Sequence, residues 1–109
     1  MLLADNSHDY LVAINPAQKV IGYTVVNWQP FLCFKGVEGY VSELFVNDEF
    51  RGLGVGKALL AEIEKIAENK NCVRLMLLNK KEWISYKRGF YQKAGWLERE
   101  DIANFIRPF

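Results

Sequence analysis

The sequence contains few of the residues from which metal sites and disulfide frameworks are built. Two of its 109 residues are cysteine, Cys33 and Cys72, and one is histidine, His8. This set indicates no metal cluster or disulfide framework, and a single histidine supplies neither a His-based triad nor a zinc site. We therefore expect no metal cofactor.

The chain also has little net charge and no long hydrophobic run. Its formal net charge is +1, with both signs mixed along the chain, which gives no electrostatic footprint for DNA or RNA. No apolar run is long enough to span a bilayer, and we expect no signal peptide. These features predict a soluble, reduced, cytoplasmic protein with neither a nucleic-acid partner nor a membrane partner.

Half of the residues are apolar, which is enough for a single packed domain over residues 1–109. Runs rich in β-branched and aromatic residues predict strands, and apolar residues at helical spacing predict helices. The expected order is strand (10–14), strand (19–28), strand (40–46), helix (ending at 69–71), strand (72–78), helix (83–94) and a strand within 96–107. The first two strands should pair as an antiparallel hairpin, and the apolar run at 72–78 should be buried on both faces. This order predicts the α/β (α+β) class with a mixed sheet.

A glycine-rich loop at residues 51–57 joins the third strand to the first helix. It reads Arg-Gly-Leu-Gly-Val-Gly-Lys, and the apolar residues of the following helix share one face: Leu59, Leu60, Ile63, Ile66 and Ala67. With so few side chains, the backbone N–H groups of the loop can approach a ligand closely. Because the first turn of a helix attracts anions, the loop predicts a phosphate site. The alternative is a glycine-rich turn that only links strand to helix.

Two common phosphate-binding motifs do not fit this loop. A Walker A loop fails because Arg51 and Ala58 stand where it requires a glycine and a Ser or Thr. The dinucleotide fingerprint fails because its third glycine would fall at Lys57 or Leu59. The remaining pattern, R-x-x-G-x-G, resembles the pyrophosphate loop of the GNAT superfamily of N-acetyltransferases.

A second stretch, at residues 89–96, strengthens this resemblance. It reads Gly-Phe-Tyr-Gln-Lys-Ala-Gly-Trp and resembles the F-Y-x-K-x-G-F signature that closes many GNAT domains. The resemblance implies a GNAT-like, mostly antiparallel sheet with a splayed central parallel pair (40–46 and 72–78) and two crossover helices. It also implies an acetyl-CoA-dependent N-acetyltransferase in which a primary amine attacks the thioester directly. Two alternatives are a non-catalytic acyl-CoA-binding module and an interaction domain whose loop binds nothing.

The resemblance assigns roles to individual positions. Backbone groups near Leu44 and Val46 would hold pantetheine, and one amide would polarise the thioester carbonyl. The residues expected to wrap the pyrophosphate are Arg51, Gly52, Gly54, Val55, Gly56 and Lys57. Asn79 would contact coenzyme A, and Ser85 or Arg88 could share or replace that contact. Tyr91 would protonate the departing thiolate, whereas the alternative interpretation makes residues 90–94 helix core.

Two departures from the family pattern affect these expectations. Family members often place a carboxylate base at the positions of Tyr40 and Ser42, whereas the only acid on this strand is Glu43, expected on the opposite face. Glu43 could be the base, a water chain could serve instead, or Glu43 could have only a structural partner. The family also usually begins with a further strand and two helices, for which this chain has no residues.

That second departure would leave a sheet edge and part of a face open. The apolar residues of the connection 29–39, at 31–34, together with residues 105–109, could bury this surface in a homodimer with the acceptor site near its interface. The rival expectation is a monomer in which the 29–39 connection packs over the open face or extends the strands.

Overall fold

The computed structural model describes residues 7–31 and 36–109, and the chain divides into two compact units, Met1–Leu78 and Asn79–Phe109. Each unit is described by itself. Residues 32–34, at the centre of the predicted dimer contact, lie outside the described residues.

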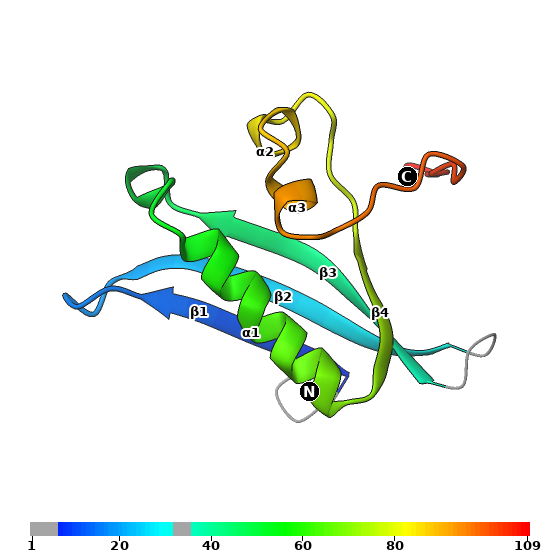
Figure 1. Cartoon of the computed structure of the whole chain (residues 1–109), viewed down its shortest axis with the longest axis horizontal. Helices are drawn as coiled ribbons and strands as arrows, with labels where there is room; N and C mark the ends of the chain where they lie inside the picture. The colour runs from blue at the N-terminus through cyan, green and yellow to red at the C-terminus, as the bar shows by residue number, and fades with distance from the viewer. Residues whose placement is uncertain (1–6, 32–35) are drawn as a thin grey trace. The chain divides into compact units, whose positions relative to one another are not determined.

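The first unit is a four-stranded sheet with one long helix (Figure 1). The strands lie in chain order: β1 (His8–Ile14), β2 (Val20–Phe31), β3 (Gly36–Val46) and β4 (Cys72–Leu77). The pairs β1–β2 and β2–β3 are antiparallel and the pair β3–β4 is parallel. The predicted hairpin, the mixed sheet and the central parallel pair are therefore confirmed. The 29–39 connection is shorter than expected because β2 and β3 both extend into it.

Helix α1 (Val55–Asn69) lies across one face of the sheet (Figure 1) and supplies half of the core. Its buried residues are Leu59, Leu60, Ile63 and Ala67, as the sequence spacing predicts, while Ile66 is half-buried. From the sheet, Ile21, Val26, Trp28 and Val41 are buried. Each large apolar side chain removed from water in this way contributes about 1.5–3 kcal/mol. The strand β4 is less buried than expected, since it pairs only with β3, and Val73 is exposed.

A β-bulge in β3 changes which face its side chains occupy. Val25 of β2 lies opposite Glu43, but the next residue, Val26, lies opposite Val41, so Ser42 is an extra residue on β3. One extra residue reverses the alternation of faces along a strand. Tyr40 and Glu43 therefore share a face, and the expectation that Glu43 points away from Tyr40 is wrong.

The second unit contains two short helices instead of one long one. These are α2 (Ile84–Lys87) and α3 (Phe90–Lys93). Between them Gly89 has a φ of +65°, a left-handed conformation that interrupts a helix. Gly95, with a φ of +94°, ends α3 as predicted. The prediction of one continuous helix over 83–94 is therefore wrong.

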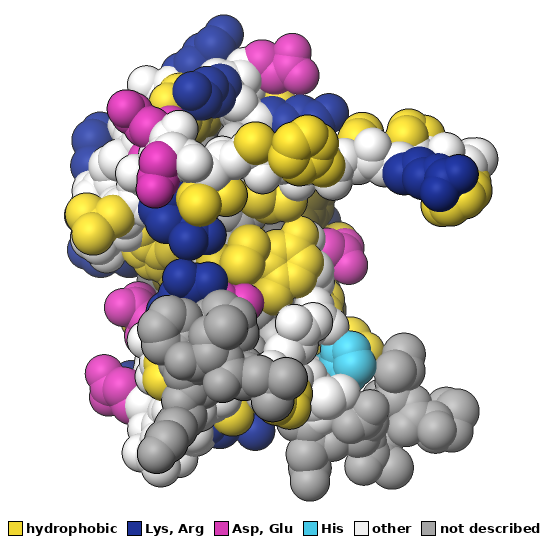
Figure 2. Space-filling view, turned by 90° about the vertical axis from the view of Figure 1, so that its right-hand side faces the viewer, with side chains coloured by type: hydrophobic (Ala, Val, Ile, Leu, Met, Phe, Trp, Pro, Cys, Tyr) yellow, Lys and Arg dark blue, Asp and Glu magenta, His cyan; other side chains and the backbone are white. Residues whose placement is uncertain are grey.

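The strand expected within residues 96–107 is absent, and residues 97–109 form no helix or strand. A strand needs a partner, and the described second unit contains no other strand. Leu97 and Phe105 are each 92% exposed. Figure 2 shows hydrophobic side chains on the surface facing the viewer.

Candidate functional site

The end of β3 is a strand edge whose pairing with β4 has stopped. The last parallel pair is Val41 with Leu77, whereas β3 continues to Val46. Since β4 ends at Leu77, β3 has no partner strand on this side from Ser42 onward in the described first unit. The parallel pair that the sequence resemblance predicts is present, and its splay stays a prediction.

Backbone groups at the end of β3 face this unpaired side. The N–H of Asn47 donates to the carbonyl of Ile21 over 2.8 Å, and Val46 lies opposite Gly22. In an antiparallel ladder this pattern directs the N–H and C=O groups of Val46 away from β2. The two-residue alternation directs those of Leu44 the same way. Leu44 and Val46 thus present main-chain groups to the side where β4 has ended.

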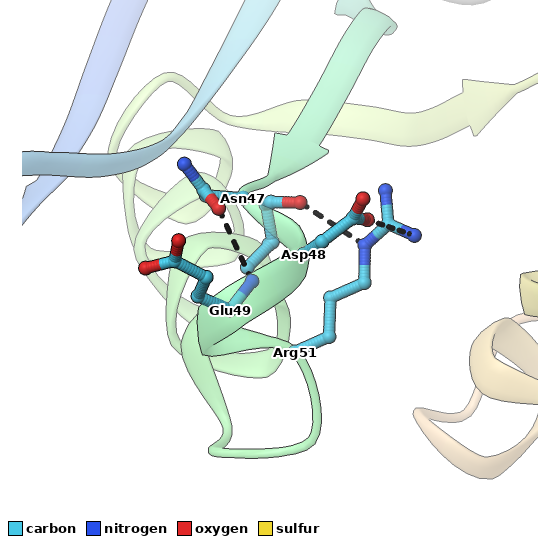
Figure 3. Close-up of polar contacts among 5 residues, drawn as sticks. Asn47, Asp48, Glu49 and Arg51 are labelled. Carbon is cyan, nitrogen blue, oxygen red and sulfur yellow. Dashed lines mark hydrogen bonds and ion pairs between the residues drawn. The ribbon is translucent and has the colours of Figure 1, made fainter.

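A short turn connects this strand end to the glycine loop (Figure 3). The side chain of Asn47 accepts a 3.1 Å hydrogen bond from the N–H of Glu49 and caps the 3-10 helix η2 (Asp48–Phe50). Arg51 donates from Nε to the carbonyl oxygen of Val46 over 3.1 Å, and its Nη1 lies 2.7 Å from Asp48 Oδ1. Arg51, expected to contact pyrophosphate, thus holds the start of the loop against the end of β3.

The glycine loop presents a row of free backbone amides. Within the described part of the chain, no hydrogen bond is recorded from the N–H groups of residues 52–57. The first helical bond runs from Ala58 N to Gly54 O over 3.0 Å. Val55, Gly56 and Lys57 form the first turn of α1, where the helix carries about half a positive charge. The predicted loop residues therefore occur together at one anion-attracting helix end.

Two glycines of the loop adopt conformations that favour glycine. Gly52 has a φ of +79° and Gly54 a φ of +86°. A Cβ atom added at either position would have no atom within 4 Å apart from its own chain neighbours. The space beside both glycines is open to a ligand, and no side chain projects into it.

Glu43 lies on the sheet face away from α1, beside two aromatic residues. The hydroxyl of Tyr23 donates to Glu43 Oε1 over 2.9 Å, and this bond raises the pKa of Tyr23 above its usual value. The rings of Tyr23 and Phe45 are 5.8 Å apart between centroids. Sequence reasoning missed Tyr23 and Phe45. Phe45 follows Glu43 by two residues, so strand alternation could have placed both on one face, whereas the place of Tyr23 depends on the register of β2 with β3. The alternative interpretation, in which Glu43 has only a structural partner, is met by Tyr23.

The second unit holds the remaining predicted residues. Ser85 Oγ donates to Asn79 Oδ1 over 3.1 Å, so the structure brings these two together. Arg88 follows α2 at its C-cap and is exposed. No contact of the Arg88 side chain to Asn79 or Ser85 is recorded among the described residues.

Tyr91 lies at the start of α3 between two aromatic rings. Its ring is 4.9 Å from that of Phe90 and 6.0 Å from that of Trp96, both in edge-on geometry. The N–H of Trp96 donates to the carbonyl of Tyr91 over 2.9 Å. Burial raises the pKa of the Tyr91 phenol above its usual value, so the group carries its proton at neutral pH. Tyr91 has the protonation state that a general acid needs.

Comparisons with known proteins identify the family. The sequence model of the Acetyltransferase (GNAT) family matches residues 2–96. The chain therefore belongs to the GNAT family of acetyltransferases, and the resemblance seen in its two motifs is confirmed.

Two relatives with assigned activities match the chain at less than 30% sequence identity. The chain is 27% identical over 86 residues to glucosamine 6-phosphate N-acetyltransferase of Trypanosoma brucei brucei, covering 78% of this chain and 56% of that protein. It is 29% identical over 85 residues to thialysine N-epsilon-acetyltransferase of Bos taurus, covering 71% of this chain and 49% of that protein. The chain thus spans about half the length of the curated relatives it matches.

Solved structures share the fold. An acetyl transferase from Pyrococcus furiosus superposes with a TM-score of 0.80 at 23% identity, over 99% of this chain and 70% of that one. An aminoglycoside acetyltransferase from an uncultured soil metagenomic sample gives a TM-score of 0.87 at 19% identity, with the same two coverages, 99% and 70%. At these identities the likeness establishes the fold alone. Among the described residues, no helix is both long enough and apolar enough to cross a membrane.

Proposed function

We propose that the chain is an acetyl-CoA-dependent N-acetyltransferase in which a primary amine attacks the thioester directly. The observation that carries this proposal is the row of unbonded amides at residues 52–57, placed directly after a strand whose own amides at Leu44 and Val46 face the side on which β4 has ended. A coenzyme with a pyrophosphate and an extended, amide-containing arm matches both features. Membership of the GNAT family supports the same assignment.

The residues present fit this cosubstrate. The loop amides and the α1 N-terminus would hold the pyrophosphate, with Lys57 adding a positive charge. The edge of β3 would pair with the amides of pantetheine, as an added strand pairs with a sheet edge. In the second unit, Asn79 and Ser85 would supply a further polar contact. When bound, acetyl-CoA supplies the acetyl group.

The protein groups would assist the transfer in two ways. As the amine nitrogen bonds to the acetyl carbon and the C–S bond breaks, Tyr91 would donate its proton to the sulfur. The amine proton would leave to Glu43 or through a chain of water molecules. A fixed N–H on β3 would stabilise the negative charge that develops on the carbonyl oxygen.

Two measurements on one preparation test this proposal. Coenzyme A at 100 times its dissociation constant should stabilise the protein by about 2.7 kcal/mol in a thermal shift assay. The same preparation should transfer acetyl groups to at least one member of an amine library. Stabilisation without transfer would favour the non-catalytic acyl-CoA-binding module. The absence of both would favour an interaction domain and overturn the proposal.

We also propose that the chain is a cytoplasmic homodimer. Exposed apolar side chains in the C-terminal segment support the dimer: Leu97, Ile102, Phe105, Ile106 and Phe109. Exposed apolar surface of this kind is usually buried by association. Sedimentation equilibrium should give the mass of two chains, and Phe105→Asp should lower it to one. Asn104→Asp, which adds the same charge without removing an apolar group, should leave the mass unchanged. A single-chain mass for the parent at micromolar concentration would exclude the dimer.

A further inference from the structure

We propose that Tyr23, Glu43 and Phe45 bind a positively charged group of the acceptor, so that the preferred acceptors carry a second cation besides the amine that is acetylated. This inference rests on the proposed N-acetyltransferase activity. All three side chains belong to the first unit and come from two paired strands, β2 and β3.

Strand alternation and the register of β2 with β3 bring these side chains together. Tyr23 and Phe45 are cross-strand partners, so their side chains share one face of the sheet. Glu43 precedes Phe45 by two residues in a regular part of β3, so it lies on the same face. There Glu43 accepts a hydrogen bond from the hydroxyl of Tyr23 over 2.9 Å. Phe45 is 48% exposed and Glu43 is exposed, so the group is open to a ligand.

The chemistry of the three side chains matches an ammonium group. Aromatic faces attract a cation within about 6 Å of the ring centroid, and the two rings stand 5.8 Å apart. Tyr23 bonds to Oε1 of Glu43, and no partner of Oε2 is recorded among the described residues. The carboxylate can therefore accept a hydrogen bond from the ligand while Tyr23 fixes its orientation. A neutral hydroxyl could donate a hydrogen bond to the carboxylate, but it would gain neither the charge attraction nor the cation–π contact.

The position on β3 places this group beside the proposed reaction site. Glu43 immediately precedes Leu44, whose backbone faces the side of β3 on which β4 has ended. An acceptor anchored by its charged end at Glu43 would keep its remaining atoms close to the strand edge. In this role Glu43 holds the cation, and the proton of the reacting amine leaves through water. The alternative is that Tyr23 and Glu43 form a surface hydrogen bond and bind no ligand.

Binding is tested directly by NMR titration of the full chain with cadaverine, a five-carbon diamine, and with the corresponding five-carbon diol. Cadaverine should shift the ring signals of Tyr23 and Phe45, and the diol should not. Phe45→Leu should weaken cadaverine binding by about fivefold, the size of an exposed cation–π contact. The matched control is Tyr10→Leu, because Tyr10 is similarly exposed, at 49%, and its ring stacks on His8 instead. This control should bind cadaverine like the parent.

Kinetics test the link to acetyl transfer. The parent should acetylate cadaverine with a kcat/KM about tenfold above that of the five-carbon amino alcohol, which lacks the second ammonium. Glu43→Gln should lower the value for cadaverine about fivefold more than the value for the amino alcohol. An equal loss on both amines would make Glu43 a general base and overturn the inference. So would unshifted ring signals in the titration. Cadaverine binding without acetyl transfer to any amine would leave the site standing and overturn the proposed function instead.

Discussion

The Nε atom of Arg51 donates a hydrogen bond to the carbonyl oxygen of Val46 over 3.1 Å, which ties the glycine loop to the end of β3. The same guanidinium lies 2.7 Å from Asp48 through Nη1. One planar group with several donors thus joins the strand end, the turn and the loop. The arrangement indicates that Arg51 shapes the loop as well as contributing charge to it.

Replacing Arg51 should therefore weaken coenzyme A binding through loop order as well as charge. Arg51→Ala should raise the dissociation constant by about tenfold, since it removes a charge-assisted bond and an ion pair at once. Lys57→Ala is the matched control, because it removes one positive charge from the same loop and is exposed. Calorimetry at two salt concentrations measures both. Equal losses of coenzyme A affinity in the two variants, both disappearing at high salt, would show that Arg51 acts through its charge alone.

The left-handed conformation of Gly54 gives a second prediction. Gly54→Ala should destabilise the fold by about 1 kcal/mol, because a Cβ atom is disfavoured at its φ of +86°. It should also weaken coenzyme A binding, since the methyl group would occupy space beside the loop amides. Gly95→Ala carries similar strain, at a φ of +94°, outside the loop. Urea unfolding should give similar losses of unfolding free energy for the two variants. Equal coenzyme A affinities for the two variants would indicate that the pyrophosphate binds elsewhere.

Local signals in the sequence predicted the elements that position the loop. The buried face of α1 follows from the spacing of residues such as Leu60 and Ile63, and both are almost fully buried. The positive φ angles of Gly52 and Gly54 agree with the choice of glycine there. These features depend on neighbours within a few positions, so a single sequence contains them.

Features that depend on pairing were not predictable in the same way. The extra residue at Ser42 exists only in relation to the register of β2, and it alone decides whether Glu43 shares a face with Tyr40. Gly89 lies inside the helix predicted over residues 83–94, and the structure places it between two short helices. The strand expected within 96–107 has suitable residues but no partner strand in its described unit. The intrinsic preference of these residues for a strand cannot supply the partner strand.

A half-buried hydrogen bond between Asp9 and Trp28 gives a prediction about stability. Asp9 Oδ2 accepts from Trp28 Nε1 over 2.6 Å, and Trp28 is only 5% exposed. Asp9→Ala should lower the free energy of unfolding by about 1–3 kcal/mol, because it leaves a buried donor unpaired. Asp9→Asn keeps an acceptor oxygen and should cost less. Urea unfolding with an unchanged m-value measures both, and equal losses would show that the bond contributes little.

Tyr91→Phe tests the proposed general acid. Turnover should fall by about 10²–10⁴-fold while coenzyme A affinity is kept, because the ring remains and the proton donor is lost.

Burial raises the pKa of Tyr91 in the folded state above the unfolded value of about 10, so the unfolded chain ionises first. The stability that this group contributes is present below pH 10 and is lost as the pH rises through the folded pKa. The Tyr91→Phe variant should lose that alkaline decline in stability.

Tyr86→Phe, which removes the 2.9 Å bond to Glu98, is the matched control for turnover and should retain it. Full turnover in a well-folded Tyr91→Phe would leave Tyr91 only a packing role against Phe90 and Trp96.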